Sequence, residues 1–143
     1  MKKSLQLKKT HIWEEPVNDW FKERMFGHTL NVCCGTSTIG DVRVDLKPRF
    51  KGILKGDMFN LSYEDNSFDV VICDPPWKLN PLLRPRNFFE LVRVCKVGGR
   101  ILFNARWIPT SKYVILKEIW LRCSYDLGDI SGLMLFEKIQ CLK

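Results

Sequence analysis

The sequence contains few of the residues that build metal centres. It has two histidines, and no two of its six cysteines stand at the C-x-x-C spacing of zinc and redox sites. We therefore expect no bound metal. Free cysteines in apolar runs behave as small hydrophobes, so we interpret the cysteines as reduced and mostly buried.

Long apolar runs are also missing. No stretch approaches the roughly 18 residues that span a bilayer. The basic residues 1–9 lead into no apolar segment of the kind found in secretory signals. We expect no membrane association and a cytoplasmic location. The length of 143 residues is typical of one domain, and neither repeats nor low-complexity segments divide it.

Acidic residues are in the minority. The chain has 23 lysines and arginines against 16 aspartates and glutamates, which gives a net charge of +7. This balance favours an anionic partner such as nucleic acid, although it also serves general solubility.

Apolar periodicity predicts an α/β protein. Helices are expected over 16–26, 88–95 and 111–118, the second ended by Gly98 and Gly99. Strands are expected over 29–34, 42–45, 52–58, 68–73, 100–104, 119–126 and 133–141. Alternating strands and helices predict a mainly parallel sheet covered on both faces. The last two strands, with Gly128 and Gly132 between them, predict an antiparallel hairpin.

Functional groups follow several of the predicted strands, and ligands of open α/β sheets bind at the carboxyl ends of the strands. Gly35 allows a sharp turn and a close approach of a ligand to the backbone. Asp45 is placed to accept hydrogen bonds from ribose hydroxyls, and Asp57 to accept one from an adenine amino group. Each aspartate is also compatible with an ordinary turn or cap.

The order of these features resembles the class I S-adenosylmethionine-dependent methyltransferases over roughly residues 29–141. Leu30–Thr36 is similar to the first motif of that family, Gly56–Leu61 and Asp65–Val71 to its adenine-binding turn and fourth strand, and Leu91–Arg100 to its helix and glycine turn before strand five. The resemblance implies a Rossmann-like fold with S-adenosylmethionine as cofactor. The residues it implies at the cofactor are Cys33, Cys34, Gly35, Asp45, Leu46, Asp57 and Met58. It also implies a catalytic domain over 29–143, preceded by an N-terminal arm and helix over 1–28.

The sequence departs from that family in two ways. Cys33 and Ser37 stand where glycines are usual, and only ten residues separate Gly35 from Asp45. A helix rises 1.5 Å per residue, so no more than about one turn fits there. We expect a tight turn instead of the first crossover helix, with Asp41 or the N-terminal arm as candidates for a missing cofactor contact.

The Asp74-Pro75-Pro76-Trp77 motif after the strand at 68–73 resembles the fourth motif of methyltransferases that modify amino nitrogens, most closely the adenine-N6 branch. The lone pair of such a nitrogen is delocalised into the ring. The Asp74 carboxylate and the Pro75 carbonyl would each accept a hydrogen bond from the amino group. These two bonds would free the nitrogen lone pair and stabilise the positive charge that develops on the nitrogen. Trp77 offers a stacking face for a base. The competing interpretation is an ordinary Asp-Pro turn with Trp77 in the core.

Basic residues follow the motif. Lys78, Arg84 and Arg86 are predicted to bind the phosphate backbone of a nucleic acid, whereas Arg93 and Lys96 are expected on a solvated helix face. Sequence specificity would come from short loops, from the N-terminal arm or from a protein partner. The alternatives are a methyltransferase of small molecules or proteins and a non-catalytic methyltransferase-like subunit.

Overall fold

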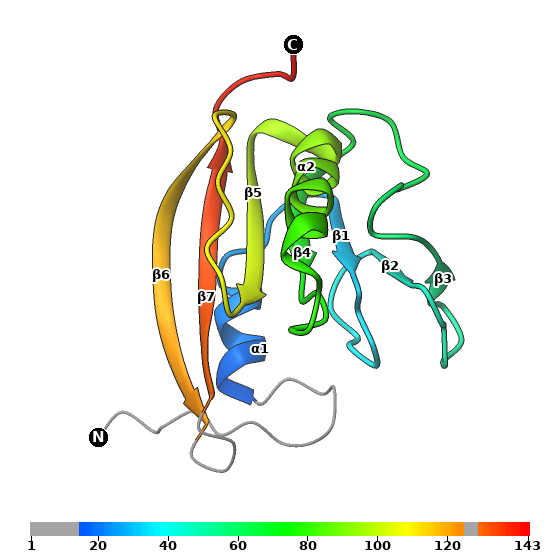
Figure 1. Cartoon of the computed structure of the whole chain (residues 1–143). Coiled ribbons are helices and arrows are strands. Elements are labelled where there is room, and N and C mark those ends of the chain that lie inside the picture. The colour runs from blue at the N-terminus through cyan, green and yellow to red at the C-terminus, as the bar shows by residue number, and fades with distance from the viewer. Residues whose placement is uncertain (1–14, 125–128) are drawn as a thin grey trace.

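A seven-stranded sheet with the order β3-β2-β1-β4-β5-β7-β6 forms the centre of the fold (Figure 1). This computed structural model describes residues 15–124 and 129–143. The strands are β1 Thr29–Val32, β2 Val42–Asp45, β3 Leu54–Lys55, β4 Phe68–Cys73, β5 Cys95–Ala105, β6 Val114–Ser124 and β7 Asp129–Lys138. Strands β1 to β5 run parallel to one another, while β7 is antiparallel to both β5 and β6. The predicted Rossmann-like α/β fold, with a mainly parallel sheet and a C-terminal antiparallel hairpin, is confirmed.

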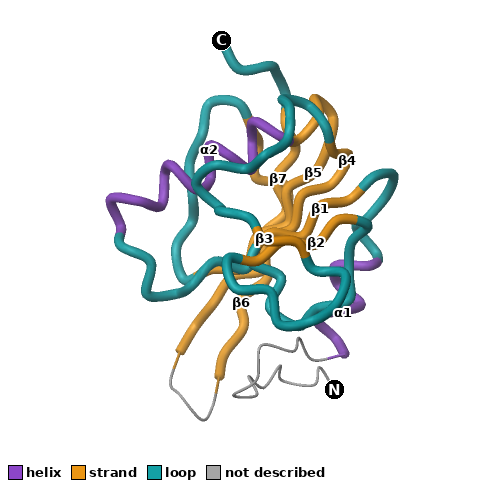
Figure 2. The backbone as a smooth tube through the Cα atoms, turned by 90° about the vertical axis from the view of Figure 1, so that its right-hand side faces the viewer, coloured by secondary structure: helices purple, strands orange, loops and turns teal. Residues whose placement is uncertain are grey.

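Two helices cover opposite faces of the sheet (Figure 2). They are α1 Glu15–Lys22 and α2 Arg84–Val94, and the short 3-10 helix η1 Pro81–Leu83 leads into the second. Successive side chains of a strand point to opposite faces. In β4, Val71 and Cys73 therefore pack in the same cluster as α2, and Val70 and Ile72 in the same cluster as α1. Neither helix of the described ranges is long and apolar enough to cross a bilayer.

The prediction of a helix over residues 111–118 is wrong. Strand β6 begins at Val114 and pairs with β7 up to Ser124. Short apolar runs fit either period, and here the β-branched residues Val114, Ile115 and Ile119 favour the strand. The pairing partner that decides between the two structures lies more than ten residues later in the chain.

The glycine pair after α2 also differs from the prediction. The helix ends at Val94, and Gly98 and Gly99 lie inside β5 instead of ending the helix. Gly98 has φ +78°, and a Cβ added at Gly99 would lie 2.7 Å from the carbonyl oxygen of Asp69. The close approach of β4 therefore requires glycine at position 99, and the β4–β5 pairing shifts register here, between Phe68 and Val70.

The expected N-terminal arm is described only from residue 15 onward. Residues 1–14 and 125–128 lie outside the described residues, and the second range contains Gly128 of the predicted hairpin. The division of the chain at residue 28 stays a prediction.

Candidate active site

The carboxyl ends of β1, β2, β4 and β5 meet at one edge of the sheet. In the registers of these strands, Val32 pairs with both Val44 and Cys73, and Cys73 pairs with Phe103. The segments that leave these strands therefore start side by side. They contain most of the residues that the sequence predicts for a cofactor and a substrate.

The turn after β1 uses the left-handed backbone conformation at two positions. Gly35 has φ +55°, as its predicted role requires, and Cys33 has φ +56°. For a residue with a side chain this conformation costs roughly 1–2 kcal/mol, so Cys33 retains a backbone shape that suits glycine. Its sulfur lies 3.4 Å from the sulfur of Met58, which joins this turn to the turn after β3. Cys34 is 2% exposed; its N–H donates to the Val44 carbonyl at 3.2 Å, and its carbonyl accepts from the Ser37 N–H at 2.9 Å.

Asp45 at the end of β2 is fixed by backbone amides. Its Oδ2 accepts a hydrogen bond of 3.0 Å from the Gly35 N–H, and its Oδ1 accepts one of 3.0 Å from the Lys47 N–H. Its carbonyl accepts a third from the Gly56 N–H at 3.0 Å. A carboxylate oxygen has two lone pairs, so each oxygen can still accept a hydroxyl hydrogen of a ribose.

Asp57 and its neighbours form an exposed turn beside Asp45. The Asp57 Oδ1 accepts from the Phe59 N–H at 2.9 Å, and its carbonyl accepts from the Asn60 N–H at 3.0 Å. Asp57 is exposed, Leu46 is 61% exposed and Met58 is half-buried. An acceptor and two apolar side chains are therefore available to a flat, polar ring.

Two buried polar atoms support a ligand at this edge. Thr36 Oγ1, directly after Gly35, and Asn87 Oδ1 on α2 have no hydrogen-bond partner among the described residues. The Asn87 amide nitrogen donates to the Met58 carbonyl at 3.3 Å, which ties α2 to the turn after β3. Unpartnered buried polar atoms are uncommon, and a bound ligand or water is one way to satisfy them.

A short loop replaces the first crossover helix, as predicted. The Asn31 amide nitrogen donates to the Ile39 carbonyl at 3.0 Å and thereby holds the loop against β1. Asp41 Oδ2 accepts from the Thr29 N–H at 2.9 Å and from its hydroxyl at 3.0 Å. Since Thr29 begins β1, Asp41 lies at the amino end of the sheet. It is not at the edge where the sequence made it a candidate for a cofactor contact.

The Asp74–Trp77 segment leaves β4 at the same edge. Asp74 and Trp77 are half-buried, Pro75 is buried and Pro76 is exposed. The Pro76 carbonyl accepts a hydrogen bond of 2.9 Å from the Leu79 N–H, which folds the segment back on itself. Neither proline has a backbone N–H that could compete for the Asp74 carboxylate.

Asn104 and Arg122 stand behind Asp74, and sequence reasoning missed both. In one orientation the Asn104 amide nitrogen donates to Asp74 Oδ1 at 3.4 Å. In the rotated orientation the amide accepts from Arg122 Nη1 and donates to the Gly132 carbonyl, both at 3.3 Å. The rotated orientation makes two bonds and is the better satisfied. Arg122 is 3% exposed, so a buried cation lies one side chain away from Asp74.

The basic residues after the motif differ in the contacts that hold them near the site. The Arg84 Nε donates to the Leu79 carbonyl at 3.2 Å, and its guanidinium lies 4.0 Å from the ring centre of Trp107. Arg86 lies 5.8 Å from the ring centre of Phe59, and Lys78 is exposed. Trp107 was missed in the sequence, although an aromatic residue two positions after the end of β5 is the signal that could have found it.

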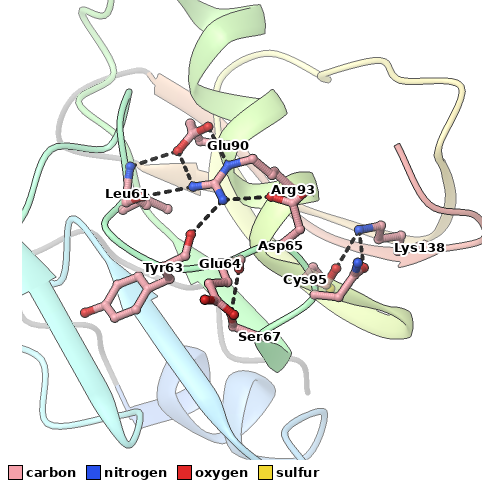
Figure 3. Close-up of polar contacts among 10 residues, drawn as sticks. Leu61, Tyr63, Glu64, Asp65, Ser67, Glu90, Arg93, Cys95 and Lys138 are labelled. Atoms are coloured by element: carbon pink, nitrogen blue, oxygen red, sulfur yellow. Dashed lines mark hydrogen bonds and ion pairs between the residues drawn. The ribbon is translucent and has the colours of Figure 1, made fainter. Parts of the chain in front are cut away.

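Arg93 fastens the loop before β4 and does not lie on a solvated helix face, which corrects the prediction (Figure 3). Its Nε and Nη2 each donate to Glu90 at 2.9 Å, and its Nη1 donates to Asp65 at 3.0 Å. Further bonds reach the carbonyls of Leu61 and Tyr63. Burial opposes ionisation of Glu90, but the hydrogen bonds from Arg93 and the Leu61 N–H outweigh it and hold its pKa below the ordinary value. Lys96, expected on the same helix face, lies on β5 instead, where its side chain is 44% exposed and pairs with Asp69 at 3.0 Å.

The buried cysteines are protonated thiols at neutral pH. Cys34, Cys73 and Cys95 are buried, and burial raises the pKa of Cys34 to about 11 and that of Cys95 to about 12. A thiol with so high a pKa is a poor nucleophile and a poor metal ligand. Within the described ranges, no group of three or more histidine, cysteine, aspartate or glutamate residues is placed to hold a metal ion.

Comparisons with known proteins agree on the fold. Residues 20–103, more than half of the chain, match the family model described as a methyltransferase domain. No curated protein matches the chain.

Solved structures resemble the chain at low sequence identity. The N-methyltransferase NodS from Bradyrhizobium japonicum WM9 is 12% identical with a TM-score of 0.60, over 87% of this chain and 92% of NodS. The [4+2]-cyclase SpnF is 12% identical with a TM-score of 0.69, over 95% and 86%. The PH0226 protein from Pyrococcus horikoshii OT3 is 18% identical with a TM-score of 0.59, over 87% of each chain. These likenesses concern the fold, since the relatives include a cyclase.

Proposed function

We propose that this chain, which belongs to the methyltransferase-domain family, transfers a methyl group to an exocyclic amino nitrogen, with adenine N6 in DNA or RNA as the favoured acceptor. The chain is a class I S-adenosylmethionine-dependent methyltransferase. The observation that carries the finer proposal is the position of Asp74 and Pro75. They leave β4 beside the β1 turn, with the Asp74 side chain half-buried and no proline N–H in competition for it.

S-adenosylmethionine supplies an electrophilic methyl group on a sulfonium, so the protein itself needs mainly to position the acceptor. The residues that would hold the cofactor are Cys33, Cys34, Gly35, Asp45, Leu46, Asp57 and Met58. In this assignment the amide-fixed carboxylate of Asp45 binds the ribose hydroxyls, and the accessible carboxylate of Asp57 binds the adenine amino group. The β1 turn contributes backbone atoms, and Leu46 and Met58 contact the adenine ring.

The Asp74 carboxylate and the Pro75 carbonyl would each accept one hydrogen of the amino group. These bonds pull the nitrogen toward tetrahedral geometry and stabilise its positive charge as transfer proceeds, which is electrostatic preorganisation. Pro76 keeps the peptide direction fixed. Trp77 is half-buried, so part of its ring is free to stack on a base, a contact worth roughly 1–3 kcal/mol. Proton loss from the product can go to solvent.

A nucleic-acid substrate is supported by charge and by the residues that follow the motif. The net charge is +7, and Lys78, Arg84 and Arg86 lie within ten residues of Trp77. Binding through these residues would weaken steeply with salt, because phosphate contacts release counterions. Only 38 residues lie between Gly35 and Asp74, so no separate recognition domain is inserted there. Specificity would then come from short loops, from the N-terminal arm or from a protein partner.

Two other functions have support of their own. The fold of NodS, named an N-methyltransferase, favours an amino-methylating enzyme whose substrate is a small molecule or a protein. The short loop after β1, together with Cys33 at a glycine position, favours a non-catalytic subunit that binds a partner. Binding that is insensitive to salt would point to the first function. Failure to bind the cofactor, with and without nucleic acid, would point to the second.

The test is incorporation of labelled methyl from S-adenosylmethionine into duplex DNA, single-stranded DNA and total RNA, followed by nucleoside analysis. We expect label in N6-methyladenosine or its deoxy form. Label at another atom, or in none of the three pools while the cofactor binds, would contradict the proposal.

A further inference from the structure

The short helix η1 presents a leucine to solvent beside the candidate active site. Leu82 is 86% exposed, and no other large apolar side chain in the described ranges is as exposed. It lies five residues after Trp77 along the chain. Single exposed apolar residues are common on protein surfaces, so the position of Leu82 has meaning only through its support and its surroundings.

The segment Asn80–Leu83, here called the tip, carries Leu82 and is held in place by hydrogen bonds. The Asn80 side chain caps η1 by accepting from the Leu82 N–H at 3.0 Å, and the Asn80 carbonyl accepts from the Leu83 N–H at 2.9 Å. Pro81 at the start of the helix fixes the backbone further. The tip is therefore ordered without a ligand, and little conformational entropy is lost when it makes a contact.

A second set of contacts fixes the tip relative to the catalytic segment. Arg84 binds the Leu79 carbonyl at 3.2 Å, and its guanidinium lies 4.0 Å from the ring centre of Trp107, which follows β5. The Leu79 N–H in turn donates to the Pro76 carbonyl at 2.9 Å. A chain of contacts thus connects Leu82 to the Asp74–Trp77 segment and to β5, and the leucine has a defined place beside the site.

The surroundings of Leu82 favour nucleic acid over protein as its partner. Residues 77–89 include Lys78, Arg84 and Arg86 and no acidic residue. An apolar side chain flanked by cations is complementary to nucleic acid, because the apolar side chain can contact stacked bases while the cations contact the phosphates beside them. Minor-groove proteins insert leucine and similar wedges between base steps in this manner.

We propose that Leu82 inserts into the base stack beside the target adenine and occupies the space that the adenine leaves when it enters the site. The inference rests on the proposed function and adds that base-paired nucleic acid is a substrate. Extrusion of a paired base costs a few kcal/mol. A rigid apolar wedge offsets part of that cost, whereas an unpaired strand needs no such help. The contribution of Leu82 is therefore confined to paired substrates.

The experiment compares wild type, Leu82→Ala, Leu82→Met and the control Leu121→Ala on native and heat-denatured plasmid DNA, and on long duplex RNA and its separated strands. Leu121 on β6 is 71% exposed, so its substitution removes another well-exposed leucine, on an element other than η1. We expect Leu82→Ala to lower kcat/KM on paired substrate by roughly tenfold or more and to leave it within about twofold on unpaired strands. Leu82→Met, which keeps the apolar volume, should restore most of the loss, and Leu121→Ala should resemble wild type.

Three results would overturn the proposed insertion of Leu82. In the first, Leu82→Ala lowers kcat/KM equally on paired and unpaired substrates, and in the second it lowers kcat/KM on neither. In the third, the wild type is active on unpaired strands only. A wild type that methylates no adenine in any of these substrates would instead show that the proposed function has failed. A second readout is the fluorescence of 2-aminopurine, placed in the duplex at the position where the wild type methylates adenine. This fluorescence should rise when the wild-type protein binds the duplex, and it should not rise when Leu82→Ala binds.

Discussion

The Asp45 Oδ2 accepts a hydrogen bond of 3.0 Å from the Gly35 N–H, so the ends of β1 and β2 are joined by the carboxylate predicted to bind ribose. This bond exists without a ligand and orients the carboxylate in advance. It also explains how a loop too short for a crossover helix still places Gly35 beside Asp45. The two residues therefore act together in the cofactor assignment.

Asp45→Ala should weaken S-adenosylmethionine binding by at least about tenfold, since it removes both charge-assisted acceptors and loosens Gly35. Isothermal titration calorimetry measures the dissociation constant of S-adenosylmethionine for both proteins. The matched control is Asp41→Ala, which also removes a carboxylate that accepts from a backbone amide, here the Thr29 N–H at the amino end of β1. Its cofactor affinity should match that of wild type. If Asp45→Ala binds as tightly as wild type, the ribose contact has been assigned to the wrong residue.

Trp77→Ala should raise the KM for nucleic acid by about ten- to a hundredfold, which corresponds to one lost base stack. Its kcat should fall far less, because Asp74 and Pro75 remain in place. Trp77→Phe keeps an aromatic face and should recover most of the affinity. Steady-state kinetics over a range of substrate concentrations separate the two constants. An unchanged KM in Trp77→Ala would contradict the stacking role of Trp77 and support the interpretation of an ordinary Asp-Pro turn.

Glu90→Gln should destabilise the fold at neutral pH by about 2 kcal/mol, as expected for one partner removed from a largely buried ion pair. The folded-state pKa of Glu90 lies below its ordinary value, so its ionised form adds stability above the unfolded pKa of about 4.3. That stability is lost as the pH falls through the lower folded pKa. Chemical denaturation at a series of pH values should show the two proteins differing most above about pH 5 and converging in acid. A difference that is constant with pH would mean that the charge of Glu90 is not what Arg93 recognises.

Features encoded within one segment could be predicted from the sequence. The β-branched run at 68–73 gave β4 and its terminal Asp74, and the glycine at 35 gave a left-handed turn. The absence of a first crossover helix followed from chain length alone, since the residues available could not form one.

Features that depend on pairing between distant segments could not be predicted from the sequence. Strand β6 was mistaken for a helix in its first half because its partner β7 comes later in the chain. Asp41 lies at the amino end of the sheet because Leu30 pairs with Val42, a register that no local pattern reveals. The approach of Asn104 to Asp74 and Arg122 likewise brings together three strands.

The most direct test of the central claim is single-turnover methyl transfer by Asp74→Ala, measured beside its affinity for S-adenosylmethionine. Loss of one preorganised electrostatic partner of the reacting group lowers a rate by roughly a hundred- to a thousandfold. The claim therefore predicts a rate at least about a hundredfold lower on the acceptor that wild type methylates, with the cofactor dissociation constant within about threefold of wild type. A mutant that transfers methyl at the wild-type rate, or one whose defect lies wholly in cofactor binding, would contradict the assignment of Asp74 to the amino nitrogen.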